Sequence, residues 1–462
     1  MLVPEPLVTP PTVLERLLRP FSKVRPGEGL QAVLLLVCVF LILTSYYMMK
    51  TAREGLILTT NVFGWRGEEL KSYAGGAMAV LLIGIVPAYG ALARRVRRIW
   101  LINVSYAIVI GCLLAFFGLG SAGVPIGLAF FIWIGLVNMF LIAQFWSYAT
   151  DLYTEEQGKR LFAIIALGGS IGAIVGPKLT TFSSTYTLMP LAAAILVGCI
   201  AMFNVIERIH VHAAAPEDKT AAETIEGKGA FALVLQNRYL LLIAALVFVA
   251  ELVKTNGEFI LSSSAAEHAA QLIPSTAHPD LVGAAHDAAI SADRREVIKA
   301  FYGDFFFWVN LVGFVIQAFL VSRVIDKLGV RRALFIMPII ALGTYGAIGV
   351  IGGVALVRAA KTAENATEYS LQNTVRQTLF LPTDRATKYK AKAAIDTFIV
   401  RFGDSLSALI VWVGVRQIGM HVGGLAFVNF GLVAVWIVIA IGIAREHKKI
   451  SKAEPPAEAT PA

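Results

Sequence analysis

The amino-acid sequence predicts an all-α, polytopic membrane protein with about twelve transmembrane helices arranged in two six-helix bundles. Hydrophobic residues make up 57% of its 462 residues and charged residues only 15%, whereas soluble domains carry about 25% charged residues. The apolar residues occur in runs of roughly 20, the length that crosses a hydrocarbon layer about 30 Å thick. Composition and run length together exclude a soluble globular protein.

Residues 1–29 precede the first apolar run and are expected to form a cytoplasmic N-terminal segment. They are Pro-rich, carry mixed charge and lack the apolar core of a cleavable signal peptide, so we expect the first span to serve as the targeting signal. Cys38, Cys112 and Cys199 all lie within predicted spans. We interpret them as small apolar side chains, neither paired in disulfides nor bound to a metal.

Lysine and arginine occur in every second loop between the predicted spans. Basic groups cluster at 94–98 after the second span and at 323–332 after the eighth, whereas the intervening loop at 121–125 carries no charge. Basic loops remain on the cytoplasmic side of a membrane. The sequence therefore predicts a multi-pass protein of the cell (inner) membrane with both termini in the cytoplasm.

The chain divides into two halves around a polar, Ala/Gly-rich linker. We expect an N-terminal six-helix bundle over 30–206, a cytoplasmic linker over 207–237, a C-terminal six-helix bundle over 238–444 and a cytoplasmic tail over 445–462. Within the second half, residues 263–300 are too polar to span and are expected to form an outer insertion with one or two short surface helices. The spacing of its three histidines fits no helical pair of metal ligands, so no metal site is expected there.

The two halves resemble each other at their basic loops. The stretch ALARRVRRIWLI after the second span matches VIDKLGVRRALFI after the eighth. A duplicated half with a basic loop at the same place is typical of transporters of the major-facilitator type, which bind substrate between their halves. The alternative is that any polytopic protein acquires basic cytoplasmic loops.

Charged and amide side chains continue into the predicted bilayer between Lys361 and Asp404. An ionisable group at membrane depth costs several kcal/mol unless it faces a cavity, a partner or a ligand, so this segment is a candidate functional site. Asn373 and Arg376 lie on one predicted helix, and Lys388, Lys390 and Lys392 lead into the next. The excess of basic groups favours an anionic substrate.

Two further clusters of charged residues lie in other predicted spans. Lys50, Arg53 and Glu54 end the first span, where they either bind substrate or extend to the membrane surface. Glu251 and Lys254 are three residues apart in the seventh span and share a helix face. They form either a structural pair or a gate whose partners exchange with substrate charge.

Three segments of the second half carry a family resemblance, namely ATEYSL at 366–371, KYKAKAAID at 388–396 and Arg401-Phe402-Gly403. In these segments the chain resembles the ATP/ADP translocase family of plastidic and intracellular-bacterial type. The resemblance implies a major-facilitator-like fold and transport of nucleotides, as in an ATP:ADP antiporter that binds ATP. The family usually has Asp, Lys and Glu where Asn373, Arg376 and Gln377 stand here, so we expect a more positive cavity than in the family.

These observations predict an alternating-access transporter of nucleotides or of another phosphorylated organic anion. Lys50, Arg53, Lys254 and Arg376 are the expected charge partners of the substrate, and Glu251 is the expected gating counter-ion. The full set of predicted substrate-binding residues is Lys50, Arg53, Glu54, Glu251, Lys254, Asn373, Arg376, Lys388, Lys390 and Lys392.

Two other functions remain open at this point. One is a proton-coupled major facilitator for an unrelated solute, with Glu251 or Glu368 as the proton carrier. The other is a membrane sensor or partner protein that transports nothing. The sequence has no catalytic constellation and no cofactor fingerprint, so we expect neither an enzyme nor a bound cofactor. The expected partners are the lipid bilayer and a small anionic substrate, without nucleic acid, and the expected state is a monomer.

Overall fold

The computed structural model describes residues 24–25, 27–62, 64–93, 96–211, 230–383, 391–392 and 394–453. Its helices fall into two compact units. The N-terminal unit comprises the described residues within 1–57, 82–219 and 295–307, and the C-terminal unit comprises those within 58–81, 220–294 and 308–462. Among the described residues, eight helices are long and apolar enough to cross a membrane. The chain is therefore an all-α, multi-pass membrane protein, as its composition predicted.

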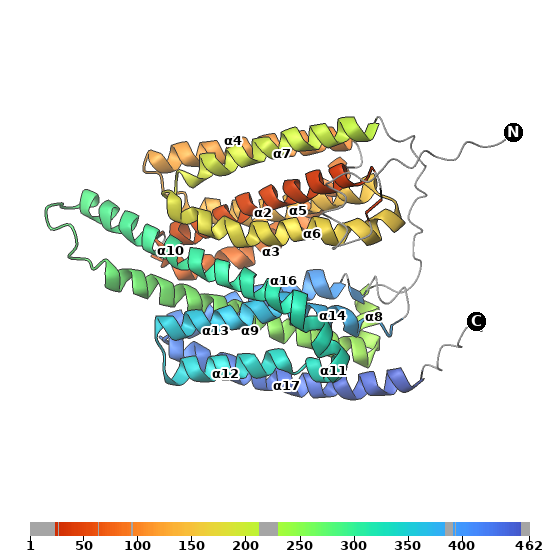
Figure 1. Cartoon of the computed structure of the whole chain (residues 1–462). Coiled ribbons are helices and arrows are strands. Elements are labelled where there is room, and N and C mark those ends of the chain that lie inside the picture. Colours follow the sequence, from red (N-terminus) through yellow and green to blue (C-terminus); the bar gives the residue numbers. More distant parts are fainter. Residues whose placement is uncertain are drawn as a thin grey trace. The chain divides into compact units, whose positions relative to one another are not determined.

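The N-terminal unit is built on a buried face of α2, and α4 and α7 lie side by side in it (Figure 1). Its helices are α2 (Gly29–Leu58), α4 (Arg98–Ser121), α5 (Gly127–Leu152), α6 (Glu155–Leu179) and α7 (Leu188–Val211), with the short η1 (Thr180–Phe182) after α6. The helix α3 (Gly67–Ala93) contributes residues to both units. A capping box between Thr154 and Gln157 begins α6, because each residue bonds the backbone amide of the other.

Glycines allow α6 to approach α2 closely. A Cβ atom at Gly168 or Gly172 would overlap the backbone carbonyl of α2, and one at Gly176 would lie 2.6 Å from the carbonyl oxygen of Thr44. These three glycines follow the small-residue spacing that brings two membrane helices together. They are therefore packing residues.

In the C-terminal unit, α9 (Arg238–Leu272) is the central helix, and it packs against α13, α16 and α17. The helix α12 lies beside α17 (Figure 1). The bounds of the other helices are α8 (Ala230–Gln236), α10 (Ala284–Val315), α11 (Val321–Ala333), α12 (Ile336–Val350), α13 (Val354–Thr367), α14 (Asn373–Leu379), α16 (Val400–Val411) and α17 (Val422–Ala453). The residues of α10 are divided between the units.

Four π-helical turns interrupt the helices in the described part of the C-terminal unit. They are η2 (Ile316–Leu320), η3 (Glu368–Gln372), η4 (Ile395–Ile399) and η5 (Trp412–Gln417). A π-turn inserts one residue into an α-helix and changes the direction in which the next side chains point, and it occurs often at functional sites. The turns η3 and η4 both contribute side chains to the cavity described below.

The expectation of short surface helices in 263–300 was wrong. The helix α9 continues to Leu272 and α10 begins at Ala284, so most of this segment belongs to two long helices. Alanine favours helix whether or not the helix is in a membrane, and polarity alone therefore does not end one. Two hydrogen bonds attach the connection between α9 and α10 to α10. His278 Nε2 lies 2.7 Å from Asp293 Oδ2, and Arg294 Nε donates to the Ile273 carbonyl at 2.9 Å.

Candidate functional site

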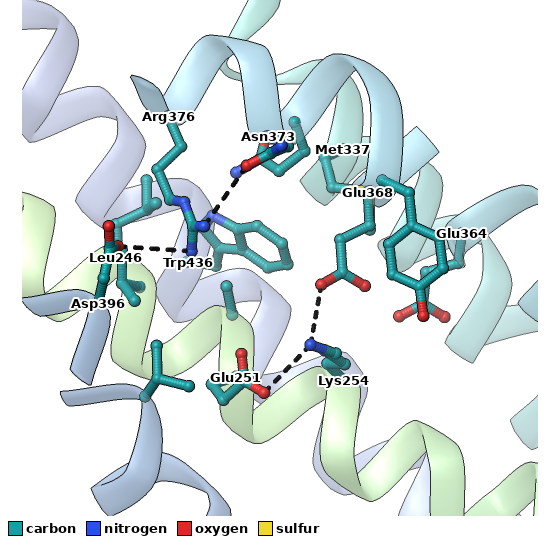
Figure 2. A pocket seen from close by; sticks show the side chains of 15 residues that line it. Leu246, Glu251, Lys254, Met337, Glu364, Glu368, Asn373, Arg376, Asp396 and Trp436 are labelled. Carbon is teal, nitrogen blue, oxygen red and sulfur yellow. Dashed lines mark hydrogen bonds and ion pairs between the residues drawn. The ribbon is translucent and has the colours of Figure 1, made fainter. Parts of the chain in front are cut away.

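A cavity of about 350 Å³ lies within the C-terminal unit, between α9, α12, α17 and the helical segments that carry η3 and η4. Its volume falls in the range of small-molecule sites. Figure 2 shows that charged side chains from several of these elements point into it. The ionisable residues that line it are Glu251, Lys254, Glu364, Glu368, Arg376 and Asp396.

Lys254 lies between two carboxylates in this cavity. Its Nζ atom is 3.2 Å from Glu251 Oε1 and 3.3 Å from Glu368 Oε1 (Figure 2). Glu251 is on the same helix face of α9, three residues away, whereas Glu368 comes from η3. The pairing of Glu251 with Lys254 agrees with their spacing, and Glu368 adds a partner that is distant in the sequence.

Arg376 lies at another side of the cavity, beside Asn373 and Asp396 (Figure 2). Its Nη2 atom donates to Asn373 Oδ1 at 3.5 Å, and its Nη1 atom is 4.0 Å from Asp396 Oδ1. Asn373 and Arg376 are one helical turn apart on α14, and Asp396 is on η4. Both distances are long for hydrogen bonds, so Asn373 and Asp396 hold the Arg376 guanidinium only weakly.

A buried ion pair supports the wall of the cavity. Lys361 Nζ lies 3.0 Å from Glu364 Oε2, and the two side chains are 0% and 1% exposed. The Tyr345 hydroxyl is 2.9 Å from both oxygens of Glu364. The approach of Tyr345 and Lys361 to α9 requires a glycine at Gly257, because a Cβ atom there would overlap the Tyr345 hydroxyl. This arrangement gives the Glu364 carboxylate the partners that a buried charge needs.

Amide and hydroxyl groups connect α9 to α16 and α17, three of the helices that contribute side chains to the cavity. Asn429 donates to the Val253 carbonyl at 2.9 Å, Asn256 donates to Asn429 at 3.1 Å, and Ser407 donates to Asn256 at 2.6 Å. All three polar side chains are buried. Satisfied buried hydrogen bonds of this kind fix the relative positions of helices. These bonds therefore hold together three of the helices that line the cavity.

The predicted residues Lys50, Arg53 and Glu54 belong to the N-terminal unit. Lys50 Nζ lies 4.3 Å from the centre of the Phe306 ring, a cation–π contact. Arg53 Nε donates to Glu54 Oε1 at 3.1 Å, and its guanidinium lies 4.5 Å from the Phe131 ring centre. Glu54 therefore pairs with its neighbour Arg53.

Two residues of the predicted basic cluster Lys388, Lys390 and Lys392 lie outside the described residues, namely Lys388 and Lys390. Lys392 is half-buried. The structure brings four of the ten predicted residues to the cavity, namely Glu251, Lys254, Asn373 and Arg376.

Glu368, Asp396 and Trp436 are among the cavity residues that were not predicted as site residues. Glu368 and Asp396 lie within motifs that carried the family resemblance, ATEYSL and KYKAKAAID, so the sequence held a signal for both. Trp436 lies in the apolar run VAVWIVIAIG, which gives no sign that its side chain faces a cavity.

The charge of the cavity differs from the expectation of a positive site. Four carboxylates line it, those of Glu251, Glu364, Glu368 and Asp396. The cavity is lined by two cations, Lys254 and Arg376. A third cation, Lys361, does not line the cavity but pairs with Glu364. The cavity therefore does not carry the excess of positive charge that the sequence predicted.

Comparison with known protein families supports the resemblance noted in the sequence. The family model of the TLC ATP/ADP transporter matches residues 344–447, which include most of the cavity, and that of the Major Facilitator Superfamily matches residues 2–177. ADP,ATP carrier protein 1 of Chlamydia trachomatis is 24% identical over 349 residues, which cover 66% of this chain and 62% of that protein. ADP,ATP carrier protein 5 of Rickettsia bellii is 24% identical over 322 residues, 59% of each chain.

Solved structures with the same fold include transporters. The nucleoside transporter NupG matches with a TM-score of 0.60 and 11% identity over 92% of this chain and 100% of that chain. The human organic anion transporter MFSD10 matches with a TM-score of 0.53 and 14% identity over 90% of this chain. The resemblance to the ATP/ADP translocase family and the major-facilitator-like fold are therefore confirmed. The chain spans less than two thirds of the length of the Chlamydia carrier.

Proposed function

We propose that this chain is an alternating-access transporter of nucleotides, of the ATP/ADP type, or of another phosphorylated organic anion. The observation that supports it most is a cavity lined by charged groups inside a bundle of membrane helices, and most of its lining residues lie in the segment that matches the TLC ATP/ADP transporter model. Charges at membrane depth are retained where they meet a substrate or a counter-ion. Relatives named ADP,ATP carriers point to the same class of substrate.

Exchange of ion-pair partners provides a mechanism for the gate. Lys254 has two carboxylate partners in the cavity, at 3.2 Å and 3.3 Å. A substrate group that takes the place of Glu368 breaks the ion pair between α9 and η3, and these two segments are then able to separate, whereas the pair of Lys254 with Glu251 lies within α9. A ligand shifts such an equilibrium only by binding one state more tightly than the other. The function is transport without chemical conversion, by a monomer in the inner membrane with both termini in the cytoplasm.

Uptake into liposomes tests this function directly. Purified protein in liposomes should accumulate labelled ATP, and internal ADP should accelerate the uptake if the protein exchanges nucleotides. Arg376→Gln should reduce the uptake about tenfold, because the loss of a charge-assisted hydrogen bond costs about 1.5–3 kcal/mol. Arg445→Gln is the matched control, since Arg445 is exposed on α17 and does not line the cavity.

Two results would contradict the proposal. Absence of uptake of any nucleotide or organophosphate, with normally folded protein, would favour a sensor or partner protein. Full uptake by the Arg376→Gln variant would remove this residue from the substrate site.

The second candidate function is proton-coupled transport of an unrelated solute. Its support is the excess of carboxylates in the cavity, of which Glu368 is the one that bridges η3 and α9. A carboxylate that releases Lys254 when it takes up a proton would couple proton flux to the gate. In that case an imposed pH gradient should drive uptake, and Glu368→Gln should abolish the dependence on the gradient. Nucleotide exchange that is independent of the gradient would rule this candidate out.

A further inference from the structure

The charges of the cavity make it a poor site for a phosphate chain. Lys254 already lies within 3.3 Å of two carboxylates, and Lys361 is fully buried against Glu364. A polyphosphate that entered here would approach four carboxylates at short range. Like charges in a site of low dielectric repel strongly, whereas an uncharged group with hydrogen-bond donors meets no such repulsion.

The part of the cavity near Arg376 contains polar groups that have no partner in the described part of the chain. The indole Nε1 of Trp436 is one of them, although Trp436 is only 2% exposed and lines the cavity. Gln372, which is 7% exposed, likewise has an unpartnered amide oxygen, and the Nε atom of Arg376 also lacks an acceptor. Buried polar groups without partners are costly, so a ligand that supplied them would gain binding energy.

These side chains match the chemistry of a nucleobase with its ribose. An indole ring offers an apolar surface for a planar heterocycle, and amide and guanidinium groups bond the donors and acceptors on its edge. Met337 and Leu246 add apolar surface to the same cavity. Carboxylates, which repel phosphate, accept hydrogen bonds from the hydroxyl groups of ribose. Asp396 Oδ1 accepts no hydrogen bond from the described residues and lies 4.0 Å from Arg376 Nη1, so it retains the capacity to accept this bond.

We propose that this cavity of the C-terminal unit is the subsite for the nucleoside moiety of the substrate, and that the phosphate groups bind outside it. This inference rests on the proposed function and states which end of a nucleotide the cavity recognises. Trp436 contacts the base, Gln372 and Arg376 bond its edge, and Asp396 bonds the ribose.

The subsite is tested with adenosine and its nucleotides, which differ only in the number of phosphates, and with pyrophosphate, which lacks the nucleoside. Affinities of the purified full chain are measured for adenosine, AMP, ADP, ATP and pyrophosphate, for the wild type and for Trp436→Phe. The substitution retains a ring but removes the N–H donor. It should weaken the binding of adenosine and all three nucleotides by the same factor, about three- to tenfold, and leave pyrophosphate unaffected.

The matched control is Trp412→Phe, because Trp412 is 39% exposed and does not line the cavity. This control should change none of the affinities. Thermal unfolding of both variants shows whether each is folded, and Gln372→Leu provides a second variant should Trp436→Phe unfold.

The outcomes separate the subsite from the function on which it rests. A loss of affinity that grows with the number of phosphates, or a loss for pyrophosphate, would place phosphate in the cavity and overturn the inference. Nucleotide binding that neither Trp436→Phe nor Gln372→Leu changes would overturn the subsite alone. Absence of binding for adenosine and for every nucleotide would overturn nucleotide transport as the function and the subsite together.

Discussion

Lys254 is shared by two carboxylates, and this changes what each single substitution should do. Removal of Glu251 or of Glu368 leaves the ammonium with one partner at 3.3 Å or 3.2 Å. Removal of Lys254 instead leaves two carboxylates without their cation, and an unpaired charge in a largely buried site is destabilising. The lysine is therefore the member of the group on which the fold depends most.

We predict that Lys254→Met lowers stability more than Glu251→Gln or Glu368→Gln, by on the order of 2 kcal/mol, since Lys254 is partly exposed. The double variant Lys254→Met/Glu251→Gln should regain part of this loss, because only one unpaired carboxylate remains. All of these variants should lose transport if exchange of partners operates the gate. Thermal unfolding in detergent and uptake into liposomes measure the two effects separately.

The control for this series is Lys449→Met, which removes a pair with Glu446 on the exposed part of α17. This substitution should leave the temperature of thermal unfolding unchanged, since exposed ion pairs contribute little to stability. Equal losses in Lys254→Met and Glu251→Gln would mean that Glu368 does not share the lysine. Normal transport by the double variant would make the pair purely structural.

At the scale of elements, the contact of α6 with α2 depends on glycine at particular positions. A Cβ atom at Gly172 would overlap the Phe40 carbonyl of α2, whereas a Cβ atom at Gly169 would lie 3.6 Å from Val39 Cγ2, an ordinary contact. The two positions are on the same helix and differ only in which way they face. Substitution of each glycine by alanine changes helix propensity equally at both positions. The difference between the two variants therefore measures the effect of the close approach of the α6 and α2 backbones.

We predict that Gly172→Ala destabilises the protein by about 1–3 kcal/mol, because the helices must move apart or distort. Gly169→Ala should be neutral or slightly stabilising, since alanine favours helix over glycine. The measurement is thermal unfolding of the purified variants side by side. A Gly172→Ala protein as stable as wild type would show that α6 and α2 are not packed as closely as the structure has them.

The sequence revealed elements more readily than it revealed sites. Runs of apolar residues predicted the membrane helices because length and hydropathy are local properties. The contact of Glu251 with Lys254 was predictable for the same reason, since three residues on a helix place both on one face. The second partner of Lys254 comes from a helix more than a hundred positions away, and no local pattern specifies that contact.

The charge of the cavity was harder to predict because it is a sum over several helices. Asn373 lacks the acid that the family has at its position, yet Asp396 on η4 lies near the same guanidinium. The π-turns η3 and η4 cannot be recognised from hydropathy, although they direct Glu368 and Asp396 into the cavity. Trp436 lies in an apolar run in which lipid-facing and cavity-facing residues look alike.

At the scale of the whole molecule, the orientation in the membrane follows from where the basic residues lie. The positive-inside rule predicts that both termini and the linker at 207–237 are cytoplasmic and that the connection between α9 and α10 is outside. Ser275 is exposed in that connection. The three native cysteines are buried or half-buried, so they are expected to react slowly with a membrane-impermeant thiol reagent.

We predict that Ser275→Cys, in a chain whose native cysteines are replaced by alanine, reacts with such a reagent in intact cells. A cysteine at Ala222 in the linker is the matched control, and it should react only after the membrane is permeabilised. Labelling is measured by the shift in mass of the purified protein. The opposite pattern at the two positions would reverse the orientation and place the basic loops outside. Reaction of both in intact cells would contradict the assignment of these segments to opposite sides of the membrane, on which the division into two six-helix bundles depends.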